Sequence, residues 1–386
     1  MSFEKCKTFV YRLVRSKGFR FLYRLFCLLP LKHKRILFAS DSRSELSGNF
    51  KYIYEEMIIK NLDLDYRFAL KDSIDTKKTF KEIAILAYLL ATSRFILIDD
   101  FYPMVYPLKI RKGADLIQVW HAAGAFKKFG YSRMGLPGGP SPTSLNHKNY
   151  TKVIVSSKNV IKQYAEGFGV SEDKIYPIGV PRTDIFFSKE FIDKTKKELY
   201  SLFPFLEKKK IILYTPTFRG NGQSTANFPI DEINVSLLYE QLNADYIFIY
   251  KLHPFIKNTK IFPEMYNEFF VDFSNYKEVN DLLLVADILI TDYSSVCFEF
   301  ALLNKPMIFF AFDLDKYTME RDFYYEYTSF VPGKIVKTST ELVNVIHSND
   351  FMTEKIKPFV DKFFDQKDGK SSERFVNEII VGKEYS

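Results

Sequence analysis

Two histidines in this sequence of 386 residues are placed where acid–base chemistry is feasible. His121 lies in QVWHAAGAFKKFG (118–130), directly after a predicted strand and before small residues that let a ligand approach the backbone. His253 lies in KLHPF (251–255), two residues after Lys251 on the same strand face. Because an imidazole titrates near neutral pH, His121 can take a proton from a hydroxyl, and the Lys251–His253 pair can bind a phosphate or protonate a leaving oxygen. A histidine buried in a core or held in a turn is the structural alternative at both positions.

The stretch TDYSSVCFEFALLNKP (291–306) has the pattern of an anion site. A predicted strand runs into a turn with Asp292, Ser294 and Ser295, and a helix follows. Unpaired N–H groups and the dipole at a helix start favour a bound anion, and serine hydroxyls add donors. Glu299, one turn into the helix, is placed to accept hydrogen bonds from a ribose diol. The structural alternative is an ordinary serine cap with both carboxylates exposed.

Two arginines also follow predicted strands. Arg219 lies in TPTFRG (215–220), where its guanidinium could bind a phosphate through two hydrogen bonds. Arg182 lies in GVPRTD (179–184), where the chain passes between two predicted domains. We therefore expect both side chains, with the two histidines, to face one ligand cleft.

The elements that must position these residues are strands that are apolar on both faces and alternate with helices. Such strands are typical of parallel sheets built from βα units. The predicted strands are 35–40, 66–70, 95–99, 116–120, 153–157 and 174–179 in a first series and 211–217, 246–252, 269–273, 287–292 and 307–312 in a second. The predicted helices are 49–61, 77–94, 158–168, 231–243, 278–286, 295–304 and 338–348.

These two series predict an α/β protein with two Rossmann-like domains, in a GT-B-like arrangement around a cleft at the carboxyl ends of the strands. We expect residues 35–185 to form the acceptor domain and 186–386 the donor domain, with the last helix a candidate to pack back on the first domain. Residues 130–146, rich in Gly, Pro and Ser, predict a lid or binding loop. No GxGxxG, P-loop, HExxH or GxSxG motif occurs, and no cysteine or histidine cluster predicts a metal site.

The net charge of +8 is concentrated at the N-terminus, where residues 1–35 carry ten Lys or Arg and one Glu. The rest of the chain is close to neutral, so a nucleic-acid groove is a poor explanation of the basicity. In residues 19–29, basic side chains form one stripe and Phe19, Leu22, Tyr23, Phe26 and Leu29 fill the opposite arc; residues 3–15 repeat the pattern, and Gly18 is a predicted break.

This pattern predicts that residues 1–34 are an amphipathic segment on an anionic membrane surface. The longest uncharged run, 25–31, is far shorter than the ~20 residues of a membrane span, and its flanks do not fit a cleaved signal. The alternative is a helix that packs on the body of the protein or mediates a dimer contact.

Four motifs in order along residues 35–365 carry a resemblance to a known family. They are WHAAGAFKKFG, TPTFRG, KLHPF and TDYSSVCFEFALLNKPMIFFAFDLDKY (291–317), followed by RDFYYEY and VPG (331–333). The sequence closely resembles the CDP-glycerol glycerophosphotransferase family of teichoic acid synthesis. The sequence resembles the primase type more than the polymerase type in two features. It is short, and it has WHAAGA where the polymerases are associated with WHGTP.

The resemblance implies a GT-B-like fold, peripheral attachment at the cytoplasmic face of the cell membrane, and no metal or other cofactor. It also implies transfer of glycerol phosphate from CDP-glycerol to an undecaprenyl-diphosphate-linked disaccharide. In this family His121 would be the base, His253 the pyrophosphate partner, and the TDYSS turn the site of the donor phosphates, with Thr291, Asp292, Ser294 and Ser295. We also assign Arg182, Arg219, Lys251 and Glu299 to the site, mainly because of their chemistry and spacing.

The expected reaction is a phosphoryl transfer in which an acceptor hydroxyl attacks the β-phosphorus of CDP-glycerol and CMP leaves. Such chemistry depends on positioning and charge neutralisation. A CDP-ribitol donor and a teichoic acid or capsule polymerase remain open within the family. Outside this family, two alternative functions are a nucleotide-sugar glycosyltransferase of the same fold and a non-catalytic membrane-bound scaffold.

Overall fold

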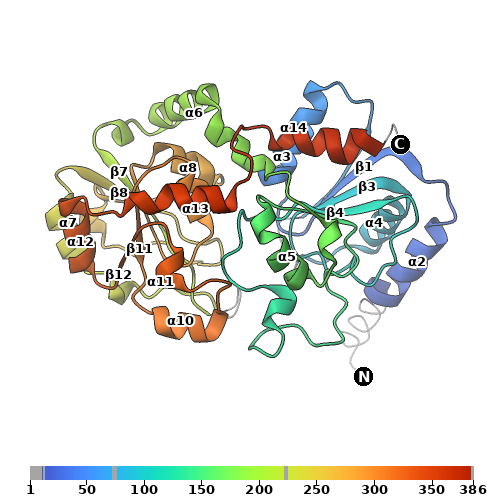
Figure 1. The fold of residues 1–386 in the computed structure, drawn as a ribbon, viewed down its shortest axis with the longest axis horizontal. Helices are drawn as coiled ribbons and strands as arrows, with labels where there is room; N and C mark the ends of the chain where they lie inside the picture. The colour runs from blue at the N-terminus through green and yellow to red at the C-terminus, as the bar shows by residue number, and fades with distance from the viewer. Residues whose placement is uncertain (1–10, 12–13, 72–75, 221–224, 384–386) are drawn as a thin grey trace. The chain divides into compact units, whose positions relative to one another are not determined.

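The protein is described by a computed structural model that covers residues 11, 14–71, 76–220 and 225–383, and it divides into two compact units (Figure 1). Unit 1 takes in the described residues of Met1–His121, Phe129–Arg182 and Lys370–Ser386, and unit 2 those of Ala122–Lys128 and Thr183–Gly369. Each unit contains a six-stranded sheet in which every pair of neighbours is parallel. The predicted α/β class with two parallel sheets is confirmed.

The sheet of unit 1 has the order β2-β1-β3-β4-β5-β6. Its strands are β1 (Lys32–Ser40), β2 (Asp65–Leu70), β3 (Ser93–Ile98), β4 (Asp115–Gln118), β5 (Lys152–Ile154) and β6 (Ile175–Tyr176). The α-helices of the unit are α2 (Phe19–Phe26), α3 (Gly48–Ile59), α4 (Phe80–Thr92), α5 (Ile161–Phe168) and α14 (Ser371–Phe375). The second halves of β1 and β3 are buried on both faces, which explains their uninterrupted apolar runs.

The sheet of unit 2 has the order β12-β11-β10-β7-β8-β9. Its strands are β7 (Lys210–Thr215), β8 (Tyr246–Tyr250), β9 (Phe270–Asp272), β10 (Ile288–Thr291), β11 (Met307–Phe310) and β12 (Lys334–Val336). Its α-helices are α6 (Lys189–Leu202), α7 (Val235–Leu242), α8 (Val279–Val285), α9 (Val296–Ala301), α10 (Leu314–Arg321), α11 (Tyr327–Phe330), α12 (Ser339–Ser348) and α13 (Ile356–Phe363). The sequence did not predict β12, a three-residue edge strand of which only Val336 is buried.

Each sheet has one place where the direction of strand addition reverses. In unit 1 this is between β1 and β3, because β2 lies on the far side of β1. In unit 2 it is between β7 and β10. Loops that leave such a pair of strands diverge and open a crevice at the carboxyl ends, which is where α/β proteins bind ligands. The segments after these four strands are therefore the first place to look for a site in each unit.

Two segments belong to another unit than their stretch of the sequence, and for the last helix the sequence had named this placement as a candidate. Residues 122–128, placed by the sequence in the first domain, belong to unit 2 because Phe126 stacks on Phe330 with ring centroids 4.8 Å apart. The last helix belongs to unit 1, where Figure 1 shows α14 beside α3 and Arg374 Nε donates to the carbonyl of Ile178 at 2.9 Å. The chain thus passes between the units at His121, Lys128, Arg182 and Gly369.

The helix predicted near the N-terminus is α2, and part of its apolar arc packs on the protein, while Leu29 stays exposed. Phe19 and Tyr23 are buried, Tyr23 Oη donates to the carbonyl of Lys109 at 3.1 Å, and Phe26 contacts Tyr88 on α4 edge to face at 5.6 Å. The expectation that this arc faces a membrane is therefore wrong for these side chains, because burial against α4 already removes them from water. Most of the predicted 3–15 helix lies outside the described residues.

The predicted break at Gly18 is also wrong. Gly18 has helical angles, φ −60° and ψ −44°, and the π-helical turn Val14–Gly18 runs directly into α2. A glycine tolerates helical angles as well as others, so its presence alone does not end a helix. No helix of the described part of the chain combines the length and apolarity that crossing a bilayer requires.

The predicted loop at residues 130–146 is held by its own contacts. It begins with the 3₁₀ turn Gly130–Arg133, Tyr131 Oη donates to the carbonyl of Ser144 at 2.6 Å, and Arg133 donates to the carbonyl of Pro137 at 2.5 Å. Its role as a lid or binding loop stays a prediction.

Candidate functional site

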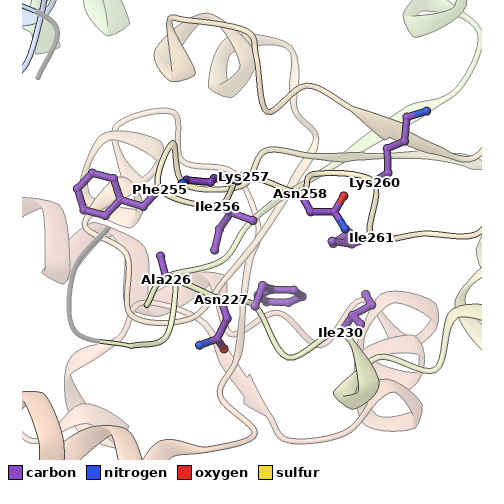
Figure 2. Close-up of a pocket in the computed structure, with 10 residues that line it drawn as sticks. Ala226, Asn227, Ile230, Phe255, Ile256, Lys257, Asn258, Lys260 and Ile261 are labelled. Atoms are coloured by element: carbon purple, nitrogen blue, oxygen red, sulfur yellow. The ribbon is translucent and has the colours of Figure 1, made fainter. Parts of the chain in front are cut away.

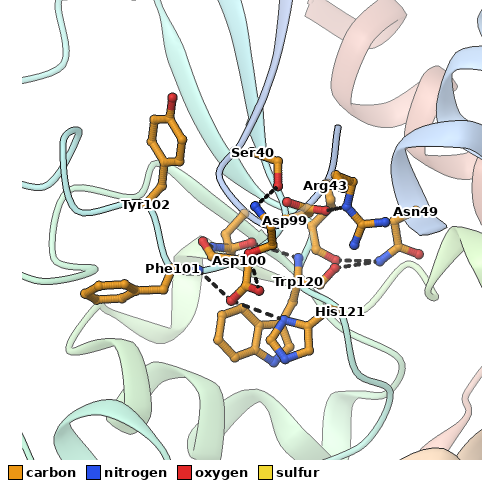
Figure 3. A network of polar contacts seen from close by, with 12 residues as sticks. Ser40, Arg43, Asn49, Asp99, Asp100, Phe101, Tyr102, Trp120 and His121 are labelled. Carbon is orange, nitrogen blue, oxygen red and sulfur yellow. Dashed lines mark hydrogen bonds and ion pairs between the residues drawn. The ribbon is translucent and has the colours of Figure 1, made fainter. Parts of the chain in front are cut away.

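A strained turn at the end of β4 positions His121 in unit 1. Trp120 has φ +52°, in the left-handed region that a bulky residue adopts only at a cost. Gln118 Oε1 accepts a hydrogen bond from the Trp120 N–H at 2.9 Å. The buried Asn49 amide donates to the carbonyls of Val119 and Trp120 at 2.9 and 2.8 Å (Figure 3). Three side-chain hydrogen bonds therefore hold a turn that the backbone alone would not favour.

The His121 imidazole lies beside a carboxylate that is itself oriented. Its Nδ1 is 3.6 Å from Asp100 Oδ1, and its ring lies 4.2 Å from the Trp120 ring (Figure 3). Asp100 accepts hydrogen bonds from the Ser42 hydroxyl at 2.8 Å and from the Phe101 N–H at 2.6 Å. The His121 side chain is 41% exposed, and Nε2 has no protein partner among the described residues. An imidazole with a carboxylate at Nδ1 and an accessible Nε2 is arranged to act as a general base.

Asp99, the residue before Asp100, has a structural role. It is buried and forms an ion pair with Arg43. Burial raises the pKa of Asp99, and the Arg43 charge opposes that rise. Ser40 is the last residue of β1 and Asp99 follows β3, so this network lies at the reversal point of the sheet. Among the described residues, no group of three or more His, Cys, Asp or Glu side chains could hold a metal ion.

Arg182 is connected to the His121 turn through one side chain. Its backbone N–H donates to Asn49 Oδ1 at 2.9 Å, while the amide nitrogen of Asn49 binds the Val119 and Trp120 carbonyls. Asn49 therefore ties the 3₁₀ turn Pro181–Phe187, in which Arg182 lies, to the turn that precedes His121. The structure thus links the backbone of Arg182 to the two residues that precede His121.

Arg219, expected to bind a phosphate, is engaged by carboxylates of unit 2. Its Nε and Nη2 donate to the two oxygens of Asp313 at 2.6 and 2.9 Å, and Nη1 donates to Asp292 at 3.0 Å. The guanidinium carbon also lies 5.0 Å from the Tyr293 ring and 5.1 Å from the Tyr317 ring. Burial alone would lower the pKa of Arg219, but the two carboxylates outweigh it and raise that pKa. The side chain thus holds the loops after β7, β10 and β11 together, which differs from the expected role.

Thr291 and Asp292 are also buried and bonded within unit 2. The Thr291 hydroxyl donates to the carbonyl of Thr215 at 2.8 Å. Asp292 Oδ1 accepts hydrogen bonds from the N–H groups of Thr217 and Tyr293 at 2.8 and 2.6 Å, and Oδ2 accepts from Arg219. Both side chains are therefore used within unit 2, and direct substrate contact by Thr291 and Asp292 stays a prediction. They join the ends of β7 and β10 at the reversal point of the second sheet.

Ser294 and Ser295 lie between β10 and α9 and are half-buried. Ser294 Oγ accepts a long hydrogen bond from the Val296 N–H at 3.4 Å, and Ser295 makes no side-chain cap. Glu299, expected at the ligand surface, is 1% exposed inside α9. The difference has a simple reason, because all six residues of this short helix are buried. Phosphate binding by the two serines stays a prediction.

Lys251 and His253 lie in the segment after β8. Lys251 Nζ donates to the carbonyls of Ser274 and Tyr276, and burial lowers its pKa. The lysine therefore holds the segment after β9, rather than standing open for a phosphate. The His253 ring lies between the rings of Phe218 at 4.7 Å and Phe255 at 4.5 Å, and its Nδ1 accepts a hydrogen bond from the Phe255 N–H at 3.2 Å.

Three residues of these networks were not identified from the sequence as functional. Asp100 directly follows the predicted strand 95–99, and this position at a strand end was a usable signal. Asn49 lies 72 residues before His121 in the chain, and Asp313 lies 94 residues after Arg219. Only the strand order brings such distant residues together, so no local pattern marks them.

Comparison with known proteins shows which family the chain resembles. The family model for CDP-glycerol:poly(glycerophosphate) glycerophosphotransferase matches residues 21–381. The chain is 54% identical over 373 residues to the teichoic acid poly(ribitol-phosphate) polymerase of Bacillus spizizenii strain W23, covering 97% of this chain and 60% of the polymerase. It is 39% identical over 385 residues to the teichoic acid ribitol-phosphate primase of the same strain, covering 97% of each protein.

A solved structure shares the fold along almost the whole chain. The wall teichoic acid polymerase TagF aligns with a TM-score of 0.77 and 25% sequence identity, covering 98% of both chains. The family model covers most of the sequence and the ribitol-phosphate relatives exceed 30% identity. The chain therefore belongs to the CDP-glycerol:poly(glycerophosphate) glycerophosphotransferase family.

Proposed function

We propose that the protein is a phosphotransferase of teichoic acid synthesis that moves an alditol phosphate from its CDP-activated form to an acceptor hydroxyl and releases CMP. The observation that carries this proposal is the His121 arrangement, with Asp100 at Nδ1 and an accessible Nε2 at the end of β4. Family membership supplies the substrate class. The GT-B-like fold of a nucleotide-sugar glycosyltransferase would supply a similar crevice, but the family model favours phosphoryl transfer.

The sequence favoured glycerol phosphate, CDP-glycerol and a primase acting on an undecaprenyl-diphosphate-linked disaccharide. Both relatives described above are named for ribitol phosphate, and one is a polymerase while the other is a primase. We therefore infer that CDP-ribitol is the preferred donor. The acceptor would be a lipid-linked teichoic acid intermediate, and the number of units added separates the primase from the polymerase.

In the proposed reaction, His121 Nε2 takes the proton of the acceptor hydroxyl as its oxygen attacks the β-phosphorus. The bond from this phosphorus to the bridging oxygen breaks, and CMP leaves with the electron pair. Asp100 stabilises the imidazolium that forms. His253, Ser294 and Ser295 of unit 2 would neutralise charge on the donor phosphates, through hydrogen bonds that strengthen as negative charge develops.

The test is to incubate the protein separately with CDP-ribitol and CDP-glycerol, each with a lipid-linked disaccharide that already carries one alditol phosphate. We expect CMP release with CDP-ribitol and a product heavier by ribitol phosphate. A single added unit identifies a primase-like enzyme, and a ladder of masses identifies a polymerase. Release of UDP from a UDP-sugar, with no CMP from either CDP-alditol, would contradict the proposal.

We also propose that the protein associates with an anionic membrane surface through the outer face of α2. Phe21, Leu25 and Leu28 on and after this helix are 47–81% exposed, although Phe19 and Tyr23 of the opposite arc are buried. Lys17 and Arg24 are exposed on the same segment. Large apolar side chains beside cations suit a bilayer interface, which would also bring the protein to its lipid-linked acceptor.

Flotation with phosphatidylglycerol vesicles tests this proposal. The triple variant Phe21→Ser/Leu25→Ser/Leu28→Ser should float far less than the wild type, and high salt should release only part of the wild type because apolar contacts persist. Ile58→Ser/Ile59→Ser is the matched control, since these side chains are exposed on α3. Equal flotation of the triple variant and the wild type would contradict the proposal.

A further inference from the structure

A cavity of about 450 Å³ lies within unit 2 between residues 226–230 and 255–261 (Figure 2). Its volume falls in the range of small-molecule sites, roughly 300–1,000 Å³. The roles assigned above to His253, Arg219 and the 291–295 turn do not use it. Its lining therefore needs a separate explanation.

The lining of the cavity combines an apolar wall with amide groups. Phe228, Ile230, Ile256 and Ile261 supply the apolar part and belong to the core cluster of this unit or pack against it. The Asn227 amide donates to the carbonyl of Thr225 at 3.1 Å, which leaves its oxygen to accept a hydrogen bond. An apolar wall with amides suits a chain of carbons that carries hydroxyls.

Both charged residues that line the cavity are lysines. Lys257 and Lys260 line it and are exposed, and in Figure 2 Lys260 extends away from the other lining side chains. Among the described residues, neither ammonium group has a carboxylate within 4.0 Å, and no lining residue is acidic. Two cations with no partner charge favour an anionic ligand and raise its local concentration.

The cavity is joined to the loops of the candidate site. Phe255 lines it, and the same ring packs on His253 with centroids 4.5 Å apart. Asn227 exchanges two backbone hydrogen bonds with Arg219, at 2.8 and 3.0 Å. The buried Arg219 network therefore fixes one wall of the cavity, and the aromatic contact with His253 fixes the other.

We propose that this cavity binds an internal segment of the acceptor polymer, in which alditol units alternate with phosphodiesters. This inference rests on the proposed function, because that function supplies a growing chain with one negative charge per repeat. The two lysines would bind consecutive phosphodiesters, and the amides and the apolar wall would contact the alditol between them. A bound internal segment would favour acceptors that already carry several units over the first acceptor in the series.

The test compares Lys257→Gln/Lys260→Gln with the control Lys208→Gln/Lys316→Gln, which removes two exposed lysines of the same unit away from the cavity. The probe is a short oligo(ribitol phosphate) without nucleotide or lipid, titrated by calorimetry at low salt. We expect the dissociation constant of the first variant to rise about fivefold, as for the loss of two exposed ion pairs. The control should match the wild type. Asn258→Asp, which places a negative charge in the lining, should weaken binding in the same direction.

A parallel titration with CDP separates polymer binding from nucleotide binding. The proposal expects CDP affinity to be unchanged in all variants. Wild-type affinity of the lysine variant for the oligomer would overturn it, and so would loss of CDP affinity in place of oligomer affinity. Absence of CMP release from either CDP-alditol by the wild type would contradict the proposed function instead, and retained oligomer binding would then still support the cavity assignment.

Discussion

The Nδ1 atom of His121 lies 3.6 Å from Oδ1 of Asp100, and Ser42 and the Phe101 N–H hold that carboxylate in place. A carboxylate in this position fixes the orientation of the imidazole and stabilises its protonated form during proton transfer. We predict that Asp100→Asn lowers kcat by roughly 10- to 100-fold, which is less than the loss of a full acid–base group. The KM for the CDP-alditol should stay close to the wild-type value.

Steady-state kinetics with Asp63→Asn as the control checks this prediction. Asp63 also pairs with a cation, Lys34, but both side chains are well exposed and removed from the His121 turn. Wild-type kcat in Asp100→Asn would show that the carboxylate does not support the base.

The Arg219 network predicts a loss of stability where the sequence predicted a loss of donor binding. Arg219→Ala leaves Asp292 and Asp313 without the buried charge that both contact. Removing one partner of a buried ion pair typically costs about 3–5 kcal/mol. We therefore expect a lower free energy of unfolding in urea. Arg321→Ala is the control, because within the described part of the chain the Arg321 side chain donates only to a backbone carbonyl, that of Gly220. A stable Arg219→Ala protein with weakened CDP binding would restore the phosphate-binding interpretation.

Gly124 in the WHAAGAFKKFG motif is needed for packing. A Cβ at this position would lie 2.0 Å from the Phe298 ring, and its φ is +62°. Gly135 has φ +86° with no atom within 4 Å of a Cβ, so it shares only the backbone strain. We predict that Gly124→Ala costs about 1–3 kcal/mol more than Gly135→Ala, by thermal or urea unfolding. Equal losses of stability in the two variants would show that backbone strain alone, without the contact to Phe298, accounts for the effect of Gly124→Ala.

The sequence predicted the framework of this protein better than the contacts inside it. Apolar runs such as 35–40 and 287–292 marked strands, because a parallel strand is buried on both faces and its pattern is local. Histidines at strand ends were likewise visible. The structural roles of Arg219 and Lys251 were not visible, because their partners lie far away in the chain. Arg219 binds a carboxylate and Lys251 binds backbone carbonyls. The burial of α2 against α4 has the same origin, since an amphipathic pattern does not say which surface covers it.

His147 predicts a dependence of stability on pH. The ring is buried beside Tyr106 and Phe168, and its Nδ1 lies 2.7 Å from the Tyr150 hydroxyl. Burial lowers the pKa of His147 to about 4, although Asp100 acts in the opposite direction. Between pH 6.5 and about 4 the unfolded chain therefore binds a proton that the folded protein does not, so stability falls as the pH is lowered.

The loss from this one group reaches about 3 kcal/mol once the pH is below both values. Urea unfolding at several pH values checks it, and His147→Phe removes the titrating group. The variant should lose less stability than the wild type across this window. Identical slopes for the two proteins would show that His147 does not cause the acid sensitivity.

The central claim is that His121 acts in the chemical step of alditol-phosphate transfer. Single-turnover CMP release from CDP-ribitol, measured with His121→Ala and with the exposed His33→Ala as the control, tests it most directly. We predict a rate about 10²–10⁴-fold below the wild type for His121→Ala, the usual range for a lost acid–base group, with unchanged CDP-ribitol affinity and a wild-type rate for the control. A His121→Ala rate close to that of the wild type would contradict the account.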